Sequence, residues 1–302
     1  MKVFHYKTES IITSPELPSI KKPFRKALVT HNDLDGIGSA VLALFNNMDF
    51  DMIYIVGYTH ITSNFVQELK TYDEVIVTDI SFGDSTLPNM KTFDHHEDLD
   101  EHCGTWQFYY NCIPKEKHTK SQNKFVYLVE VYDNWKISDP LFHSACLLNG
   151  FFLALTGSRY KECIHFQTIN DSIWRNIFHQ LIIMLQTPSF KLNDVQRVKA
   201  NEFQLKINNE IVSIKDSYEV IQSRNLSYMI FHRPKTDGSL VAHRLMEELN
   251  LDFVVMTYRG GDKCSLRSRE VNLFQIENFQ GHAHAGVAQW TLNINGFQLR
   301  VN

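Results

Sequence analysis

Residues 26–45 read KALVTHNDLDGIGSAVLALF, and this stretch decides the fold class. A short apolar run over residues 26–30 is followed by the polar segment HNDLDG, and residues 37–45 then have the composition of a buried helix. Gly36 allows the backbone to turn tightly as it leaves the strand. The order of strand, polar loop and helix is typical of an α/β domain.

The same pattern continues along the chain. Residues 53–56 and 75–78 are short β-branched runs, with a helix-like stretch over residues 64–69 between them. Such βαβ units build a parallel sheet, so we expect a mainly parallel sheet flanked by helices. Residues 97–123, acidic and then lysine-rich, predict a solvated loop, whereas residues 141–186 have helical spacing.

The length of 302 residues favours two domains. Residues 193–214 predict one long helix capped by Asn193, which we interpret as a connector. The expected organisation is an N-terminal arm (1–25), a catalytic α/β domain (26–190), a connector helix (191–215) and a smaller C-terminal α/β domain (216–302). Within the last we expect a helix over 239–249 and strands over 218–221, 227–232, 253–258 and 263–267.

The composition excludes several classes of protein. A net charge of -4 does not suit a protein that coats long nucleic acid, so any phosphate-bearing ligand must be held locally. Five cysteines without a CxxC pair favour reduced thiols and a cytoplasmic location. The polar N-terminus lacks the apolar core of a signal peptide, and the absence of an 18-residue apolar run argues against a membrane span.

Acidic and imidazole side chains follow two of the expected strands. His31, Asp33 and Asp35 stand at i, i+2 and i+4, and in an extended segment such residues point to the same side. Asp79 comes directly after the apolar run 75–78. Each feature alone is more often a helix cap or a solvated turn than a metal site. Acidic residues at strand ends nevertheless lie where open α/β sheets bind ligands.

Two further motifs supply related side chains. In FDHHE, Asp94 precedes the adjacent histidines His95 and His96, which point in different directions on extended backbone. In VYDNW, Asp133 lies between aromatic residues and could equally belong to a surface turn. Taken together, the four motifs offer carboxylates and imidazoles for two metal ions that share a carboxylate. This donor set suits Mn²⁺ or Mg²⁺ better than a metal that prefers soft ligands.

The motifs HNDLDG, VTD, DHH and YDNW occur in the order found in the DHH-family phosphoesterases, which this sequence resembles. The resemblance is closest to the oligoribonuclease branch of the nanoRNase B type. Downstream, CSLRSR (264–269) and GHAHAG (281–286) resemble the DHHA1 domain of that family. The resemblance implies a metal-dependent hydrolase with two divalent ions, Mn²⁺ first, with Mg²⁺ or Co²⁺ as alternatives.

The resemblance also implies roles for individual residues. One metal would be held by His31, Asp33 and Asp79, and Asp79 would bridge to the second. The second metal would take Asp35, Asp79, His95 and Asp133. Asp94 would orient the histidines, and His96 would face the scissile phosphate. The residues that the resemblance assigns to catalysis are Asp33, Asp35, Asp79, His95, His96 and Asp133.

The C-terminal motifs imply a substrate-binding role. Arg267 and Arg269 alternate with serines, so we expect both guanidinium groups on one side of a strand, where they would grip one phosphate. The small-residue loop with two histidines would allow close approach of a ligand. The residues implied in substrate binding are Ser265, Arg267, Arg269, Gly281, His282 and His284.

Several functions remain open at this stage. The leading hypothesis is hydrolysis of short RNA or DNA oligonucleotides to mononucleotides by metal-activated water. The alternatives that use the same metals are a pAp phosphatase and a cyclic (di)nucleotide phosphodiesterase. A single-strand DNA exonuclease is less favoured because no basic surplus is present. The alternative outside the enzymes is a nucleotide-binding module without catalytic activity. The resemblance also leaves open whether the protein forms a homodimer.

Overall fold

The structure is a computed structural model, and it divides into two compact units, Met1–Ala200 and Asn201–Asn302. The residues that it describes are 3–4, 24–95, 102–156, 171–223, 226–257, 263–269, 273, 280–282, 285–289, 291–294 and 297–300. The boundary between the units falls inside the long helix α8 (Asp194–Ser217).

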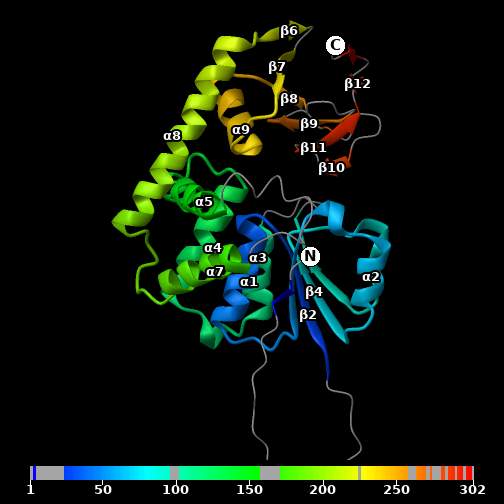
Figure 1. The fold of residues 1–302 in the computed structure, drawn as a ribbon, viewed down its shortest axis with the longest axis vertical. Helices are drawn as coiled ribbons and strands as arrows, with labels where there is room; N and C mark the ends of the chain where they lie inside the picture. Colours follow the sequence, from blue (N-terminus) through cyan, green and yellow to red (C-terminus); the bar gives the residue numbers. More distant parts are fainter. Residues whose placement is uncertain are drawn as a thin grey trace, which may run out of the picture. The chain divides into compact units, whose positions relative to one another are not determined.

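The first unit is built on a five-stranded sheet in the order β1-β3-β2-β4-β5 (Figure 1). The pairs β3–β2, β2–β4 and β4–β5 are parallel, and only β1, from the N-terminal arm, is antiparallel to its neighbour β3. The expectation of a mainly parallel sheet is therefore confirmed. The strands are β1 (Val3–Phe4), β2 (Lys26–His31), β3 (Met52–Val56), β4 (Glu74–Thr78) and β5 (Met90–Phe93).

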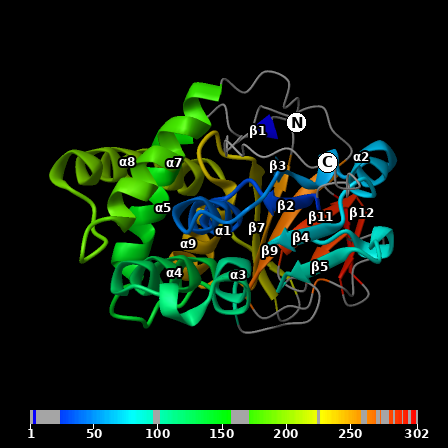
Figure 2. The same cartoon turned by 90° about the horizontal axis from the view of Figure 1, so that it is seen from below.

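Helices cover both faces of this sheet. Helix α2 (Ser63–Leu69) lies on one face, whereas α1 (Leu34–Phe45), α3 (Gly104–Cys112) and α4 (Lys120–Asp133) lie on the other (Figures 1 and 2). Residues at all five positions of β3 are buried, as expected for a strand covered on both sides. The remaining elements are α5 (Phe142–Thr156), α7 (Asp171–Leu185), and the 3₁₀ turns η1 (Tyr58–His60), η2 (Gly83–Ser85) and η3 (Lys115–Lys117).

The core under α2 is formed by alternate residues of the central strands. Val29, Tyr54 and Val77 are fully buried and pack with Phe65 and Leu69 of α2. Burying side chains of this size contributes about 1.5–3 kcal/mol each. Because β2, β3, β4 and β5 are parallel, their carboxyl ends lie at one edge of the sheet.

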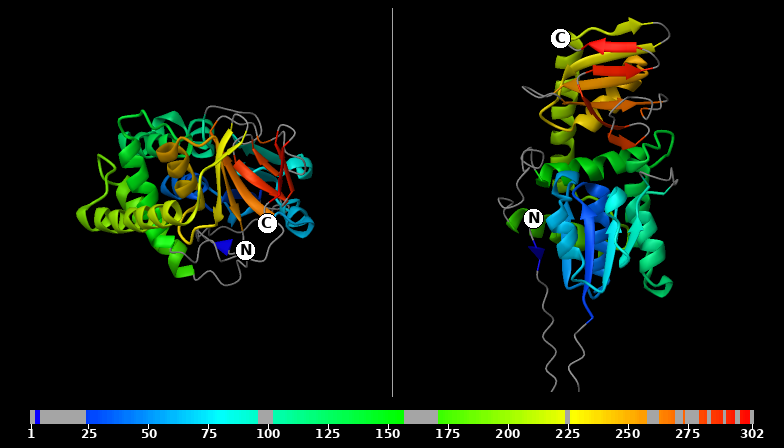
Figure 3. Two further views of the ribbon diagram at one scale, coloured as in Figure 1. Left: turned by 90° about the horizontal axis from the view of Figure 1, so that it is seen from above. Right: turned by 90° about the vertical axis from the view of Figure 1, so that its right-hand side faces the viewer.

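The second unit contains a six-stranded sheet in the order β10-β11-β9-β8-β7-β6 (Figure 3). Strands β7 and β8 are parallel and the other pairs are antiparallel. Helix α9 (Gly238–Leu249) packs against β8 and β9. The strands are β6 (Ile221–Ser223), β7 (Leu226–His232), β8 (Phe253–Thr257), β9 (Lys263–Ser268), β10 (Gln280–His282) and β11 (Ala285–Gln289), and β12 (Thr291–Ile294) pairs with β13 (Phe297–Arg300).

Helix α8 forms where the connector helix is expected. The Oδ1 atom of Asn193 accepts from the Gln196 amide at 2.9 Å, and the Gln196 side chain accepts in return from the Asn193 amide at 2.9 Å. This reciprocal pair satisfies two amide groups at the start of the helix. The helix continues to Ser217, three residues beyond the predicted end.

Two secondary-structure predictions are wrong. The segment 97–123 is not a solvated loop throughout, because α3 and the start of α4 lie within it, and Phe108 and Tyr109 of α3 are fully buried. The buried side chains of α3 pack in the core, although the polar and charged residues of the segment resemble those of a loop. The strand expected over 218–221 begins only at Ile221, since residues 218–220 connect the end of α8 at Ser217 to β6 and belong to neither element. Among the described residues no helix is long and apolar enough to cross a membrane.

Candidate metal centre

The predicted ligands meet at the carboxyl edge of the first sheet. His31 is the last residue of β2, and Asp79 directly follows β4. His95 follows β5 by two residues, and Asp133 is the last residue of α4. Because β2, β4 and β5 are parallel neighbours, these strand ends lie side by side. The sheet therefore positions three of the six predicted ligands, and α4 adds a fourth.

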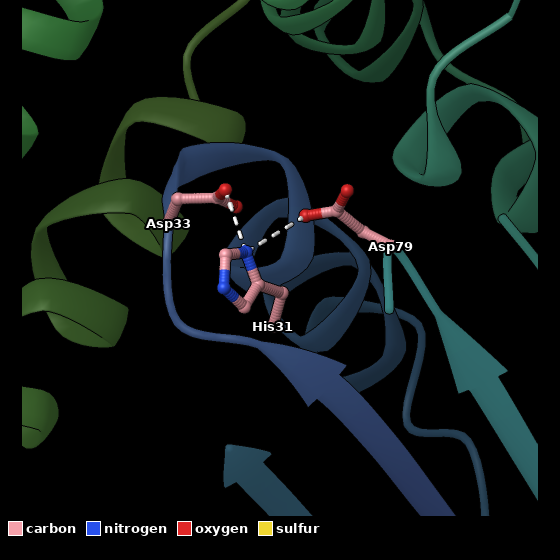
Figure 4. A group of neighbouring side chains, drawn as sticks. All are labelled: His31, Asp33 and Asp79. Atoms are coloured by element: carbon pink, nitrogen blue, oxygen red, sulfur yellow. Dashed lines mark hydrogen bonds and ion pairs between the residues drawn. The ribbon is translucent and has the colours of Figure 1, made fainter. Parts of the chain in front are cut away.

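His31, Asp33 and Asp79 form the first group (Figure 4). The Nδ1 atom of His31 lies 2.7 Å from Asp33 Oδ2 and 3.6 Å from Asp79 Oδ2. One potential ligand atom from each residue lies within 4.8 Å of the others. The group therefore has the size and the donor atoms of a metal site.

Asp35, His95 and Asp133 form the second group, with ligand atoms again within 4.8 Å of one another. The Nε2 atom of His95 lies 3.1 Å from Asp133 Oδ2 and 3.7 Å from Asp79 Oδ1. The two carboxylate oxygens of Asp79 therefore face different groups, Oδ2 toward His31 and Oδ1 toward His95. This is the arrangement that a bridging carboxylate requires.

The backbone at Asp79 is unusual. Its φ angle is 56°, in the left-handed region that few residues other than glycine adopt, and the side chain is 1% exposed. Its amide donates to the Phe93 carbonyl at 2.9 Å, and Gly104 of α3 lies directly behind it. A conformation of this kind costs about 1–3 kcal/mol and persists where the surroundings impose it, often at functional sites.

Asp35 reaches the cluster in a way that the sequence does not predict. Extended spacing was expected to place it beside His31 and Asp33, but β2 ends at His31 and Asp35 lies in the first turn of α1. Its carboxylate accepts from the Gly104 amide at 2.7 Å and from the Thr105 amide at 2.8 Å. The N-terminus of α3 thus fixes the carboxylate of Asp35, which forms a group with His95 and Asp133.

The electrostatics of the cluster fit divalent cations. Burial and then the negative charge of Asp133 raise the pKa of Asp35 to about 6. Burial, together with Asp33 and Asp35, raises the pKa of Asp79 well above its usual range. Burial lowers the pKa of His95, but bonds to Asp133 and Asp79 outweigh it and raise that pKa to about 12. Crowded carboxylates repel one another, and hard cations with oxygen and imidazole ligands would relieve that repulsion.

Three predicted residues of the first unit need separate comment. Asp94 is half-buried beside His95, at the end of β5. His96 lies outside the described residues, so its role facing the phosphate stays a prediction. Asp133 is the last residue of α4, so it belongs to a helix and not to a simple surface turn, and Trp135 lies in the turn that follows with a φ of 48°.

In this structure Arg267 and Arg269 have different partners, so their joint grip on one phosphate stays a prediction. The Arg267 guanidinium donates to Ser239 Oγ at 2.9 Å and to the Leu266 carbonyl at 2.7 Å, whereas Arg269 donates to Asn250 Oδ1 at 3.0 Å. Ser239 lies in the first turn of α9, and Asn250 directly follows the last turn. The two residues are therefore roughly 16 Å apart along the helix axis. The two side chains therefore bind opposite ends of one helix.

The strand register brings other predicted residues of the second unit into one row. Arg267 on β9 is opposite Ala285 on β11, and Ala285 is opposite His282 on β10. Positions 267 and 282 are thus two strands apart, about 10 Å at the usual strand spacing. Ser265 is buried on β9 and Gly281 lies on β10, whereas His284 falls outside the described residues.

The sequence analysis missed Glu130, which lies one turn before Asp133 on α4. Its side chain is 3% exposed and accepts from the Cys103 amide at 2.9 Å, from His102 Nδ1 at 3.1 Å and from Lys136 Nζ at 2.7 Å. Burial raises its pKa, but these partners outweigh burial and lower it overall. Glu130 therefore fixes the start of α3, whose amides hold Asp35. The only feature of the sequence that points to Glu130 is its spacing from Asp133, Glu-x-x-Asp, which places both residues on one face of a helix.

We expect Glu130→Ala to destabilise the protein and to disturb the candidate metal site indirectly. Loss of the buried acceptor leaves the Cys103 amide without its partner, which costs about 1–3 kcal/mol. Urea unfolding measures that loss, and calorimetry should show weaker Mn²⁺ binding because Asp35 is less well positioned. Glu116→Ala, at an exposed site in η3, is the matched control. Equal stability of the two variants would contradict the role assigned to Glu130.

No protein-family model matches this chain, and no curated protein matches it. Solved structures with a similar fold include a pGpG-specific phosphodiesterase, PggH from Vibrio cholerae, at 16% identity and a TM-score of 0.48, covering 88% of this chain and 92% of that one. RecJ from Thermus thermophilus with Mn²⁺ has 12% identity and a TM-score of 0.45, covering 88% and 49%. CDC45 from Entamoeba histolytica has 11% identity and a TM-score of 0.45, covering 88% and 92%. All three identities are below 25%, and all three TM-scores are below 0.5.

Proposed function

We propose that this chain is a two-metal phosphodiester hydrolase of the DHH family that cleaves short oligonucleotides to mononucleotides. The observation that carries the proposal is the position of Asp79. A buried carboxylate in a strained backbone conformation faces two groups of ligands, with its oxygens 3.6 Å from His31 and 3.7 Å from His95. The order of the motifs HNDLDG, VTD, DHH and YDNW supports the same family.

The donor set indicates which residues would hold each ion. His31, Asp33 and Asp79 would hold one, and Asp35, Asp79, His95 and Asp133 would hold the other. Two divalent cations supply Lewis acidity that activates a water molecule and neutralises charge on the phosphoryl group.

The other contributions come from the chain itself. The amides of Gly104 and Thr105 fix the orientation of the Asp35 carboxylate, so it needs little rearrangement when a cation binds. Asp33 accepts from the Gly36 amide at 3.1 Å and lies 2.7 Å from His31, which restrains both side chains. With a side chain 44% exposed, Asp33 is the most accessible of the carboxylates in the first group. A phosphate would therefore approach the cluster beside Asp33.

The choice of a short substrate rests on charge and on the family resemblance. A chain with net charge -4 has no basic surplus for gripping a long polyanion. Affinity must then come from the metal centre and from a few local contacts, which suits a ligand of two to a few nucleotides.

The test is a substrate panel with purified full-length protein and Mn²⁺. We expect a labelled RNA dinucleotide to be converted to mononucleotides, and EDTA to abolish the reaction. RNA and DNA of two to twenty nucleotides, pAp and cyclic dinucleotides form the rest of the panel. Faster turnover of pAp or of a cyclic dinucleotide would support the proposed metal centre but contradict the proposed oligonucleotide substrate. Mn²⁺ binding without turnover of any of these substrates would favour a nucleotide-binding module.

A further inference from the structure

Tyr58 borders the first ligand group. The register of β2 with β3 places Val56 opposite His31, and the chain passes through Gly57 into η1, which begins at Tyr58. The ring centroid of Tyr58 lies 5.5 Å from that of the His31 imidazole, and the two planes are tilted by 56°. An aromatic side chain therefore stands directly beside the proposed metal centre.

About half of the Tyr58 residue is exposed to solvent. Tyr58 is 52% exposed, which places it among the exposed large hydrophobic residues of the described part of the chain. Two other exposed tyrosines of the first unit have different surroundings. Tyr110, 47% exposed, packs against Trp106, and Tyr127, 43% exposed, donates to Asp139. The Tyr58 ring, by contrast, meets a residue of the ligand groups, His31.

The backbone under Tyr58 is held in place. The Gly57 amide donates to His60 Nδ1 at 3.0 Å, and the His60 amide donates to the Gly57 carbonyl at 2.9 Å. The Ile61 amide donates to the Tyr58 carbonyl at 3.2 Å. A ring carried on a fixed turn loses little freedom when a flat ligand stacks on it, so its position favours binding.

We propose that Tyr58 is the stacking platform for the base of a nucleotide whose phosphate lies at the metal centre. The inference rests on the proposed function and names the part of the substrate that Tyr58 recognises. In a nucleotide, the sugar separates the base from the phosphate. The Tyr58 ring is likewise next to the first ligand group, where it neighbours the imidazole of His31. Stacking accepts every base, because every base has a π face. The site would thus distinguish nucleotides from other phosphate esters without reading sequence.

The test compares AMP with ribose 5-phosphate, which carries the same phosphate and sugar but no base. Calorimetry with the full chain and Mn²⁺ should show tighter binding of AMP to the wild-type protein. Tyr58→Ala should weaken AMP binding by about ten-fold or more and leave ribose 5-phosphate binding unchanged. Tyr58→Phe and Tyr58→Trp should retain the preference for AMP. Tyr110→Ala, at a site of similar exposure on α3, is the control and should bind AMP like the wild type.

Each outcome decides the role of Tyr58. Equal loss of both ligands in Tyr58→Ala would overturn the proposal, since Tyr58 would then act only by supporting His31. A wild-type protein that fails to bind AMP, or does not distinguish it from ribose 5-phosphate, would also overturn it. If the wild-type protein hydrolyses no phosphodiester but binds AMP, and Tyr58→Ala loses that binding, the stacking role stands and the proposed hydrolase fails. If the wild-type protein is an active hydrolase and Tyr58→Ala binds AMP as tightly as the wild type, the proposed hydrolase stands and the stacking role fails.

Discussion

Asp79→Asn should abolish phosphodiester hydrolysis while leaving the protein folded. The amide side chain would offer one neutral carbonyl oxygen where both ligand groups now meet a carboxylate. Loss of a bridging ligand should remove several kcal/mol of transition-state stabilisation, about a thousand-fold or more in rate. Asparagine tolerates the left-handed backbone at this position, where φ is 56°, so the fold should survive. Dinucleotide turnover and Mn²⁺ calorimetry measure the two losses.

The same substitution should stabilise the metal-free protein. Burial, followed by the charges of Asp33 and Asp35, raises the pKa of Asp79, so the ionised form costs folding free energy. An acid with a raised pKa in the folded state binds more protons there than in the unfolded state. Stability therefore falls as pH rises from the ordinary aspartate pKa, about 3.9, toward the raised value. Asparagine does not ionise, so this loss disappears.

Thermal unfolding in EDTA between pH 5 and pH 8 tests this sign. The melting temperature of Asp79→Asn should exceed that of the wild type increasingly as pH rises, and Mn²⁺ should then reverse the order. Asp49→Asn, at an exposed carboxylate of the same unit, should behave like the wild type in both measurements. A fully active Asp79→Asn variant, or one that binds Mn²⁺ as the wild type does, would reject the bridging role.

The sequence predicts most of the first sheet and of the cluster for one physical reason. Apolar runs such as 26–30 and 75–78 have to be buried on both faces, which leads to parallel strands. The carboxyl ends of parallel strands meet at one edge, so polar residues that directly follow them converge. His31 and Asp79 come together in this way, and His95 follows on the next strand.

Asp35 and Glu130 show where that reasoning ends. The orientation of Asp35 depends on amides of α3, which lie about 70 residues away in the chain, as the separations of its two bonds, 69 and 70 residues, show. Helix α3 itself was missed because its polar and charged flanks resemble a loop, although Phe108 is buried. A single glutamate on a helix carries no signal of burial, so the contacts of Glu130 could only come from the structure.

Arg267 and Arg269 illustrate a different limit. Alternation on a strand places two side chains on one face of the sheet, and this part of the argument concerns the backbone. An arginine is long enough to choose among several partners. Here Ser239 and Asn250, at the two ends of α9, determine where the guanidinium groups lie. Strand spacing predicts the face but not the destination of such side chains.

Gly36→Ala should produce the largest loss of stability among substitutions at the proposed metal centre. A β-carbon at this position would lie 2.3 Å from the His31 carbonyl oxygen and 2.7 Å from the His31 nitrogen. Both atoms belong to the backbone and cannot rotate away, so the end of β2 or the start of α1 must move. Forcing an extra carbon into so tight a contact should cost about 3 kcal/mol or more.

The movement should also reach the ligands, because Gly36 is bonded to both sides of the turn. Its amide donates to Asp33 Oδ1 at 3.1 Å, and its carbonyl accepts from Thr30 Oγ1 at 2.5 Å. We therefore expect Mn²⁺ affinity and turnover to fall together with stability, as measured by calorimetry and urea unfolding. Gly57→Ala is the matched control at the end of β3, since its β-carbon would meet nothing nearer than His60 Nδ1 at 3.5 Å. If both variants unfold at the same urea concentration, the close approach of Gly36 to His31 does not hold the site together.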